Sequence, residues 1–170
     1  MLANFLLGTL EMLSLMTSNE AHTLERLARM TLLARHGEMV DVAVVTHVHV
    51  GNGSIPDPAA RANRRILEVL GPLNPGSFGP IGILHEEGFA HEFQVSTSNP
   101  ELMIANKRFA VEGLRNTPSS GRVTIGGGWR YTQAGAEILS LLDLDPDPDF
   151  LSSLRDALSA YGLTLLDVGS

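Results

Sequence analysis

Apolar side chains recur at helical spacing in residues 1–16 and share one face of the helix that this spacing predicts. These positions are Leu2, Phe5, Leu6, Leu10 and Leu13. The segment contains Glu11, lacks the leading basic residues of a signal peptide, and is too short to cross a bilayer. We therefore expect a helix that packs on the core or on a partner, and no membrane partner.

Helical and alternating patterns then follow one another, separated by capping and turn residues. Thr17 and Glu20 form a capping box, and Thr132 is placed to cap a later helix. Asp57 is predicted to cap a helix with Pro58 at its first position, and Asp147-Pro148 is predicted to start the last helix. The predicted elements are helix 18–35 ending at Gly37, strand 38–50, helix 58–70, helix 76–88, strands 89–97, 102–111 and 123–131, helix 132–142, helix 150–161 and strand 163–168.

The order of elements in the middle of the chain is that of a winged helix: helix, strand, helix, helix and β-hairpin. Its clearest signals are a helix end at Leu84-x-x-x-Gly88-Phe89 and a helix start at Thr132-x-x-Gly135. We therefore predict an α+β fold with a winged-helix-like core. Its parts are an N-terminal apolar helix (1–16), a winged-helix-like domain (17–142), and an acidic hinge followed by a C-terminal helix and strand (143–170).

Composition narrows the environment and the partners. The 170 residues are 44% hydrophobic and 18% charged, which is ordinary for a globular protein. The chain has no Cys, which excludes disulfides, thiolate zinc sites and cysteine nucleophiles and agrees with a cytoplasmic location. The formal net charge of −7 disfavours a nucleic-acid partner, because binding to phosphates requires a positive surface.

A DNA-binding transcriptional regulator is the first alternative, because winged helices commonly read DNA. The expected reading helix, residues 76–88, carries Glu86 and Glu87 and no basic residue, so standard base reading is disfavoured. Phosphate contacts in this alternative fall to basic residues of the preceding helix and the hairpin. They are Arg61, Arg64, Arg65, Lys107, Arg108, Arg122 and Arg130.

A metal-dependent enzyme is the second alternative. His47 and His49 stand two residues apart on a predicted strand, so both imidazoles project from one face, as in some metal sites. No motif identifies a third ligand. Candidates for that role are Asp41, His85, Glu86 and His91.

Other motifs predict no reactive centre. The triplet Gly126-Gly127-Gly128 lies inside a strand-like run without a nearby lysine, so we expect a bulge or bend rather than a phosphate-binding loop. No serine has a recognisable base beside it, and no Gly-x-Ser-x-Gly elbow occurs. We accordingly predict no catalytic residue, no cofactor and no enzymatic activity.

Four stretches carry a likeness to a known family: Gly8–Leu13, the helix at residues 18–33, Leu84–Phe89, and Tyr131–Leu142 with the Pro-Asp-Pro-Asp-Phe segment after it. On these residues the whole chain resembles an uncharacterised bacterial family of unknown function that also occurs in phage-derived proteins. The resemblance implies that this region forms the C-terminal part of a longer protein. It supplies no catalytic residues.

The function expected first is a non-enzymatic protein-interaction or oligomerisation module. The apolar N-terminal helix, an acidic reading helix and the missing reactive centre all favour it. We expect a homo-oligomer or a protein partner that binds the apolar face of residues 1–16, within a larger phage-related or defence-related protein.

Overall fold

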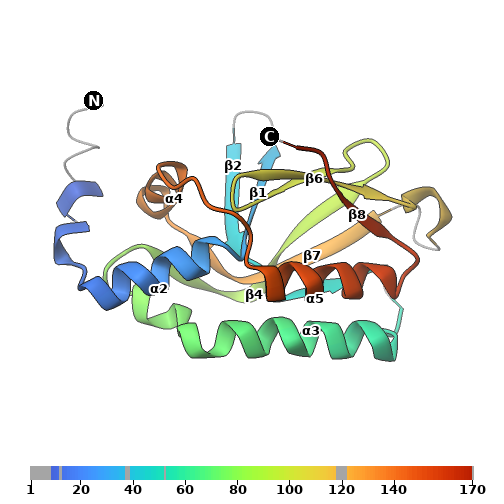
Figure 1. The fold of residues 1–170 in the computed structure, drawn as a ribbon, viewed down its shortest axis with the longest axis horizontal. Helices are drawn as coiled ribbons and strands as arrows, with labels where there is room; N and C mark the ends of the chain where they lie inside the picture. Colours follow the sequence, from blue (N-terminus) through green and yellow to red (C-terminus); the bar gives the residue numbers. More distant parts are fainter. Residues whose placement is uncertain (1–8, 12, 37–38, 52, 118–121, 170) are drawn as a thin grey trace.

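An antiparallel sheet of eight strands organises the residues that the structure describes, which are 9–11, 13–36, 39–51, 53–117 and 122–169. The structure is a computed structural model (Figure 1). The strands are β1 (Thr31–His36), β2 (Met39–Val44), β3 (His47–His49), β4 (Leu84–Ser96), β5 (Glu101–Ile104), β6 (Lys107–Glu112), β7 (Arg122–Tyr131) and β8 (Thr164–Asp167). The helices are α2 (Ser18–Ala28), α3 (Asp57–Leu70), α4 (Gln133–Ser140) and α5 (Pro148–Ser159), with 3-10 turns η1 (Gly71–Leu73), η2 (Pro75–Phe78) and η3 (Leu114–Asn116).

Strand β7 joins the two parts of the sheet. The strand order is β3-β7-β2-β1-β5-β6-β8, and β4 pairs with β7 outside this path. β2 and β3 share one edge of β7 in a single register, with Val44 opposite Trp129 and His47 opposite Gly126. They therefore form one strand with a break between them, which confirms the strand type predicted over residues 38–50.

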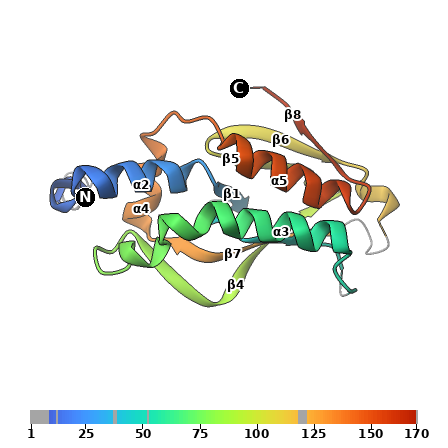
Figure 2. The ribbon, with the colours of Figure 1, turned by 60° about the horizontal axis from the view of Figure 1, so that its bottom comes forward.

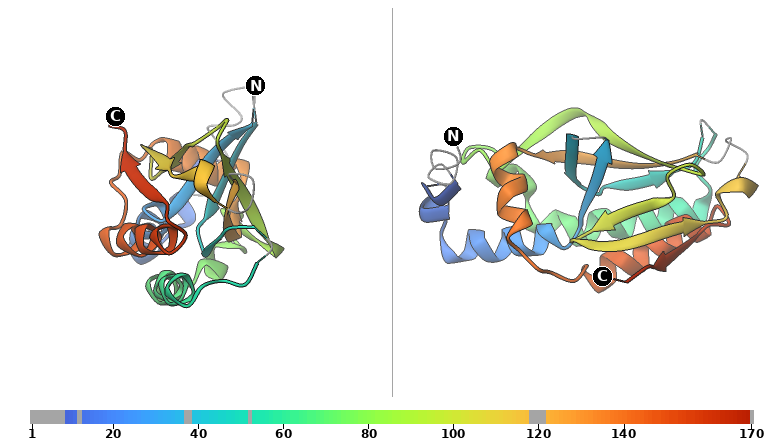
Figure 3. Two further views of the ribbon diagram at one scale, coloured as in Figure 1. Left: turned by 90° about the vertical axis from the view of Figure 1, so that its right-hand side faces the viewer. Right: turned by 90° about the horizontal axis from the view of Figure 1, so that it is seen from above.

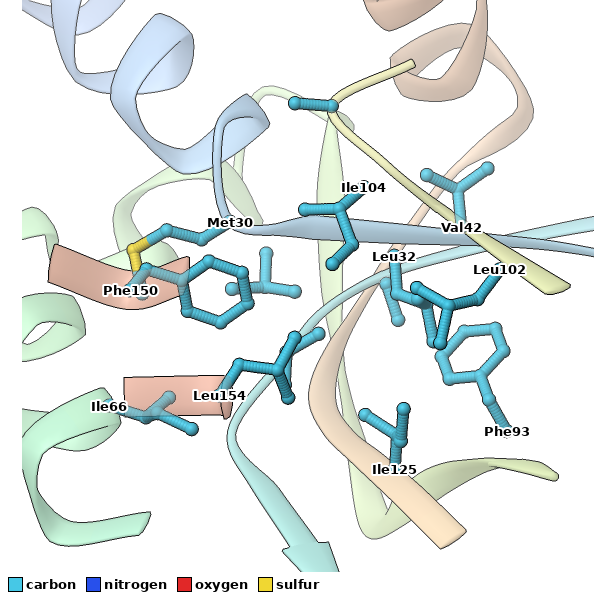
Figure 4. Packing of buried hydrophobic residues seen from close by; sticks show 14 of the residues in the cluster. Met30, Leu32, Val42, Ile66, Phe93, Leu102, Ile104, Ile125, Phe150 and Leu154 are labelled. Carbon is cyan, nitrogen blue, oxygen red and sulfur yellow. The ribbon is translucent and has the colours of Figure 1, made fainter. Parts of the chain in front are cut away.

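Helices α3 and α5 lie side by side across one face of the sheet (Figures 1 and 2). The sheet curls over them, as the end-on and top views show (Figure 3). Ile66 of α3 and Phe150 and Leu154 of α5 are fully buried against the strands. In Figure 4 these side chains meet residues of β1, β5 and β7 in one apolar core.

The outer edge of β3 is closed by a side chain of α3. Asn63 Oδ1 accepts a hydrogen bond from the Val48 N–H, and Asn63 Nδ2 donates one to the Val48 carbonyl, both at 2.9 Å. The amide of Asn63 thus takes the place of a neighbouring strand. It holds β3 from one side while β7 holds it from the other.

The predicted winged-helix fold is wrong. The expected reading helix over residues 76–88 does not form: η2 covers Pro75–Phe78, and β4 begins at Leu84. Pro75 and Pro80 remove backbone donors, and Gly82 has a φ of 75°, so a helix cannot run through this segment. Leu84 instead pairs with Tyr131 of β7. The fold is a curled antiparallel sheet with helices packed on it.

The structure differs from the predicted elements at two further places, residues 31–36 and residues 102–111. The helix predicted over residues 18–35 ends at Ala28, and Thr31–His36 pairs as β1 with β2. Gly37, expected to end that helix, lies outside the described residues. The strand predicted over residues 102–111 is a hairpin of β5 and β6, turned at Ala105 and Asn106, whose φ angles are 47° and 65°. Positive φ at both positions matches a two-residue hairpin turn.

The helix starts set by local capping are confirmed. Thr17 and Glu20 form the capping box of α2, the Thr132 hydroxyl accepts from Gly135 N–H, and Asp147 accepts from Phe150 N–H. Asp57 is the first residue of α3 rather than its cap, and Pro56 occupies the capping position. β8, predicted as a strand at residues 163–168, pairs with β6, so the last helix and strand belong to the same sheet and core as the rest.

Candidate metal centre

Three side chains of the kinds that bind metal ions meet on the sheet. His47 and His49 come from β3, and Glu92 comes from β4. One ligand atom from each residue lies within 4.8 Å of the others. The cluster contains two imidazoles and one carboxylate, a set of ligands that zinc and iron proteins use.

The strand register explains why these three residues meet. His47 and Glu92 both pair with Gly126, one from each edge of β7. Directly paired residues of an antiparallel sheet project from the same face, and residues two apart on a strand do so as well. His47, His49 and Glu92 therefore share the face above Gly126.

The opposite face fixes this register. Val48 on β3 and Phe93 on β4 alternate with the cluster residues, Ile125 on β7 precedes Gly126, and all three apolar side chains are buried in the core. A shift of one residue in any of these strands would expose its apolar residue and turn its polar neighbours inward. The hydrophobic core thus sets the positions of the cluster.

Gly126 provides the space over which the cluster converges. A Cβ atom at this position would lie 2.1 Å from Cε1 of His47, so the imidazole occupies the place of a side chain. Neighbouring strands lie about 4.8 Å apart, so the backbones of β3 and β4 are about 10 Å apart across β7. Because Gly126 has no side chain, it leaves room for side chains from both strands to meet above it.

The glycine triplet is therefore explained by close approaches within a strand. Gly127 also lacks room for a side chain, because its Cβ would lie 2.5 Å from the carbonyl oxygen of Val44, next to the break between β2 and β3. The register between β4 and β7 shifts between Glu86 and His91, directly beside the triplet. The triplet lies inside β7, as predicted, and the irregularity expected at this place is found on the neighbouring strand β4.

Electrostatic surroundings favour a neutral His47. Burial lowers the pKa of His47 below its ordinary value of 6.5, the nearby His49 lowers it further, and Glu92 opposes both effects. The rings of His47 and His49 are stacked with centroids 5.7 Å apart and an angle of 9° between their planes. A neutral imidazole keeps the lone pair that a metal ion requires.

The hydroxyl group of Thr46 contacts one ring nitrogen of His47. Thr46 Oγ1 lies 3.1 Å from His47 Nδ1 and 3.1 Å from the carbonyl oxygen of Gly126. The Thr46 N–H also donates to this carbonyl, at 2.8 Å. Thr46 is thus attached to β7 through both its backbone and its side chain.

Binding a metal ion would require side chains to move, and at least one of the two stacked imidazole rings would have to turn, because a nitrogen lone pair lies in the plane of its ring. Two ligand atoms bound at about 2.0 Å in a tetrahedral site lie about 3.3 Å apart, less than the present limit of 4.8 Å. Glu92 is exposed, and its carboxylate can approach the two histidines by rotation about its own bonds. His47 and His49 are half-buried, so one side of the cluster faces solvent.

The structure brings together the two predicted histidines and supplies a third residue that the sequence did not indicate. Of the residues considered as third ligand, the side chains of Asp41 and His91 lie outside the described ones, and His85 and Glu86 are not members of the cluster. The only local signal for Glu92 was alternation with Phe93 in a strand-like run. Its pairing with Gly126 depends on contacts far apart in sequence.

The basic residues proposed to contact phosphates are spread over three elements. Arg61, Arg64 and Arg65 lie on α3, Lys107 and Arg108 on β6, and Arg122 and Arg130 on β7. Several form ion pairs with carboxylates. These pairs join Arg65 to Asp156, Lys107 to Asp143 at 3.4 Å and to Asp145 at 3.6 Å, and Arg108 to Glu101 at 2.8 Å. Such pairing lowers the positive potential available to a nucleic acid.

The apolar N-terminal segment is described in part. Leu2, Phe5 and Leu6 lie outside the described residues, whereas residues 9–11 and 13–15 are helical. Leu10 is 61% exposed and Leu13 is 37% exposed. Thr9 is buried, and its hydroxyl donates to a carboxylate oxygen of Glu137 in α4 at 3.2 Å. One side of this segment is thus fixed to α4, while leucine side chains on it remain in contact with solvent.

Comparison with protein-family models, with curated proteins and with solved structures finds no match to this chain. The resemblance to a bacterial and phage-related family therefore stays a prediction. Among the described residues, no helix combines the length and apolarity needed to cross a membrane. The geometry of the cluster at His47, His49 and Glu92 is the basis on which a function can be assigned.

Proposed function

We propose that this protein binds a divalent transition-metal ion through His47, His49 and Glu92, and that Zn²⁺ is the favoured ion. The observation that carries the proposal is the convergence of their ligand atoms to within 4.8 Å above Gly126. Imidazole nitrogen favours zinc, copper, iron and nickel over magnesium and calcium. Two histidines and one carboxylate therefore favour a transition metal.

The number of ligands favours a site with an accessible coordination position. Structural zinc sites are closed by four protein ligands, whereas catalytic sites use three and leave a position for water or substrate. The cluster offers three ligands and faces solvent. A metal ion bound there would act as a Lewis acid toward a small molecule in the open position. This makes metal-assisted chemistry the function to test after binding itself.

Zinc binding can be measured by calorimetry and by competition with a chromophoric chelator. We expect one ion per chain, and we expect His47→Ala, His49→Ala and Glu92→Gln each to weaken binding by more than about 100-fold, since even outer-shell partners of metal ligands contribute about 10- to 100-fold. His22→Ala is the matched control, because His22 is an exposed histidine of α2 outside the cluster. Cobalt substitution reports the coordination number through its visible absorption, and magnesium should not compete.

Two results would contradict the proposal. One is the absence of stoichiometric binding of zinc, cobalt or nickel to the folded protein. The other is binding that the three cluster variants leave as strong as the His22→Ala control, which would place the ion elsewhere.

Self-association through the N-terminal helix is a second candidate function. It is favoured by the exposure of Leu10 (61%) and of Leu15 (72%), both on helical residues. Large apolar side chains on one exposed segment are typical of protein interfaces. This function is independent of metal binding.

A further inference from the structure

We propose that Thr46 is a positioning residue for the metal centre, which holds His47 in the tautomer whose Nε2 is free to bind the ion. The proposal rests on the proposed metal-binding function. It adds a role for a residue that binds no metal itself. It concerns the arrangement of hydrogen atoms around one hydroxyl group.

The hydroxyl of Thr46 has two possible partners and a single hydrogen. The Gly126 carbonyl, 3.1 Å away, can only accept, so a hydrogen bond to it requires the hydroxyl to donate. The oxygen of Thr46 is then left as an acceptor for His47 Nδ1, also 3.1 Å away. In this arrangement Nδ1 carries the hydrogen and both contacts are satisfied.

The opposite arrangement is poorer by one hydrogen bond. If Nδ1 were unprotonated, the Thr46 hydroxyl would have to donate to it and would no longer donate to Gly126. Two contacts would then hold one hydrogen bond instead of two. Because His47 is half-buried, the loss is not fully replaced by water. The geometry therefore favours the Nδ1–H tautomer.

This tautomer directs the free lone pair to Nε2. A histidine that binds metal through one nitrogen commonly donates its other N–H to an oxygen atom, which fixes the ring orientation and raises the basicity of the ligand. Thr46 supplies that oxygen. It is itself held to β7 by its N–H, which donates to the Gly126 carbonyl at 2.8 Å. The same glycine thus makes room for the ring and anchors the residue that orients it.

The tautomer can be measured in the metal-free protein by long-range ¹⁵N–¹H correlation of the imidazole nitrogens, above the pH range in which histidine titrates. His47→Gln assigns the signal. We expect Nε2 of His47 to be unprotonated in the wild type and in Thr46→Ser, and protonated to a substantial extent in Thr46→Val and Thr46→Ala. A wild-type His47 that carries its hydrogen on Nε2 would overturn the proposal, whether or not the variants fold.

Zinc affinity gives the second measurement. We expect Thr46→Val to weaken binding by about 10- to 100-fold and Thr46→Ser to stay within a few-fold of the wild type. If wild-type protein shows the expected tautomer but binds no zinc, the metal function fails while the contact between Thr46 and His47 stands. If zinc binds and Thr46→Val changes neither tautomer nor affinity, the role of Thr46 fails while the metal function stands.

Discussion

At the scale of single residues, Gly126 controls the cluster by having no side chain. A methyl group at this position would lie 2.1 Å from the imidazole of His47, and the ring would have to leave its place. We expect Gly126→Ala to abolish zinc binding and to destabilise the protein by about 1–3 kcal/mol through overpacking. Chemical denaturation and zinc titration measure the two effects.

The control for this substitution is Gly71→Ala. No atom lies within 4 Å of a Cβ built at Gly71, and its φ of −51° suits alanine. This variant should keep wild-type zinc affinity and a stability equal to or slightly above that of the wild type. Wild-type zinc affinity in Gly126→Ala would show that the ring of His47 does not occupy this space when metal binds.

The lowered pKa of His47 makes the stability of the metal-free protein depend on pH. Below the ordinary value of 6.5 the unfolded chain protonates this histidine more readily than the folded protein does. The unfolded state therefore binds more protons, and the free energy of unfolding falls as the pH falls through and below this value. In His47→Gln this contribution should be missing.

The measurement is a series of denaturant titrations between neutral and mildly acidic pH for the wild type and His47→Gln. Because His47 is partly exposed, solvent screening keeps the difference in slope small. Equal slopes in the two proteins would show that the folded state does not resist protonation of His47.

At the scale of elements, substitutions in the N-terminal helix test whether the protein associates with itself. Leu10 and Leu15 are among the most exposed large apolar side chains of the described residues. If this segment forms a subunit interface, Leu10→Glu with Leu15→Glu should convert an oligomer into a monomer, since buried charge opposes association. Light scattering coupled to size exclusion reports the mass. A wild type that is already monomeric would eliminate homo-oligomerisation.

Elements fixed by local contacts could be predicted from the sequence, whereas elements fixed by distant pairing could not. The starts of α2, α4 and α5 depend on Thr17, Thr132 and Asp147, whose side chains bond to backbone groups three residues ahead. The sequence of residues 31–36 and 84–88 predicts helix, but both segments are strands, because β2 pairs with residues 31–36 and β7 pairs with residues 84–86. Tertiary pairing outweighed local preference at these places.

The site divides in the same way. Alternation along β3 placed His47 and His49 on one face, and a period of two is a property of the strand itself. Glu92 joined them only through the register of β3, β7 and β4, which brings together segments about 45 residues apart in sequence. No local pattern encodes that register. The role of Gly126 could not be predicted for the same reason, because a glycine in the sequence does not indicate which side chain will lie against it.

At the scale of the whole molecule, the C-terminal helix belongs to the central core. Phe150 is fully buried among residues of the sheet and α3 (Figure 4). Phe150→Ala should lower the free energy of unfolding by about 3–5 kcal/mol, the range for large aromatic truncations in cores. Trp129 on β7 is the one tryptophan of the chain, so its fluorescence reports the sheet while circular dichroism reports the helices.

Coincidence of these two signals is the informative result. If α5 and β8 share one core with the rest, fluorescence and circular dichroism should give a single transition in the wild type, and both should move together in Phe150→Ala. A C-terminal part that unfolds by itself would instead give two separate transitions, with only the dichroism shifted by the substitution.

The side chain of Asn63 has a consequence beyond holding β3 in place. In a three-residue strand that is paired along one edge, only the middle residue can point its backbone N–H and carbonyl toward the other edge. In β3 this residue is Val48, and both of its backbone groups are bonded to Asn63. Strand edges with open backbone groups invite other chains to extend the sheet, which leads to aggregation. Asn63 leaves no such template on β3. The strand that carries both histidines can therefore stay near the surface, open to a small ion, while remaining closed to another polypeptide.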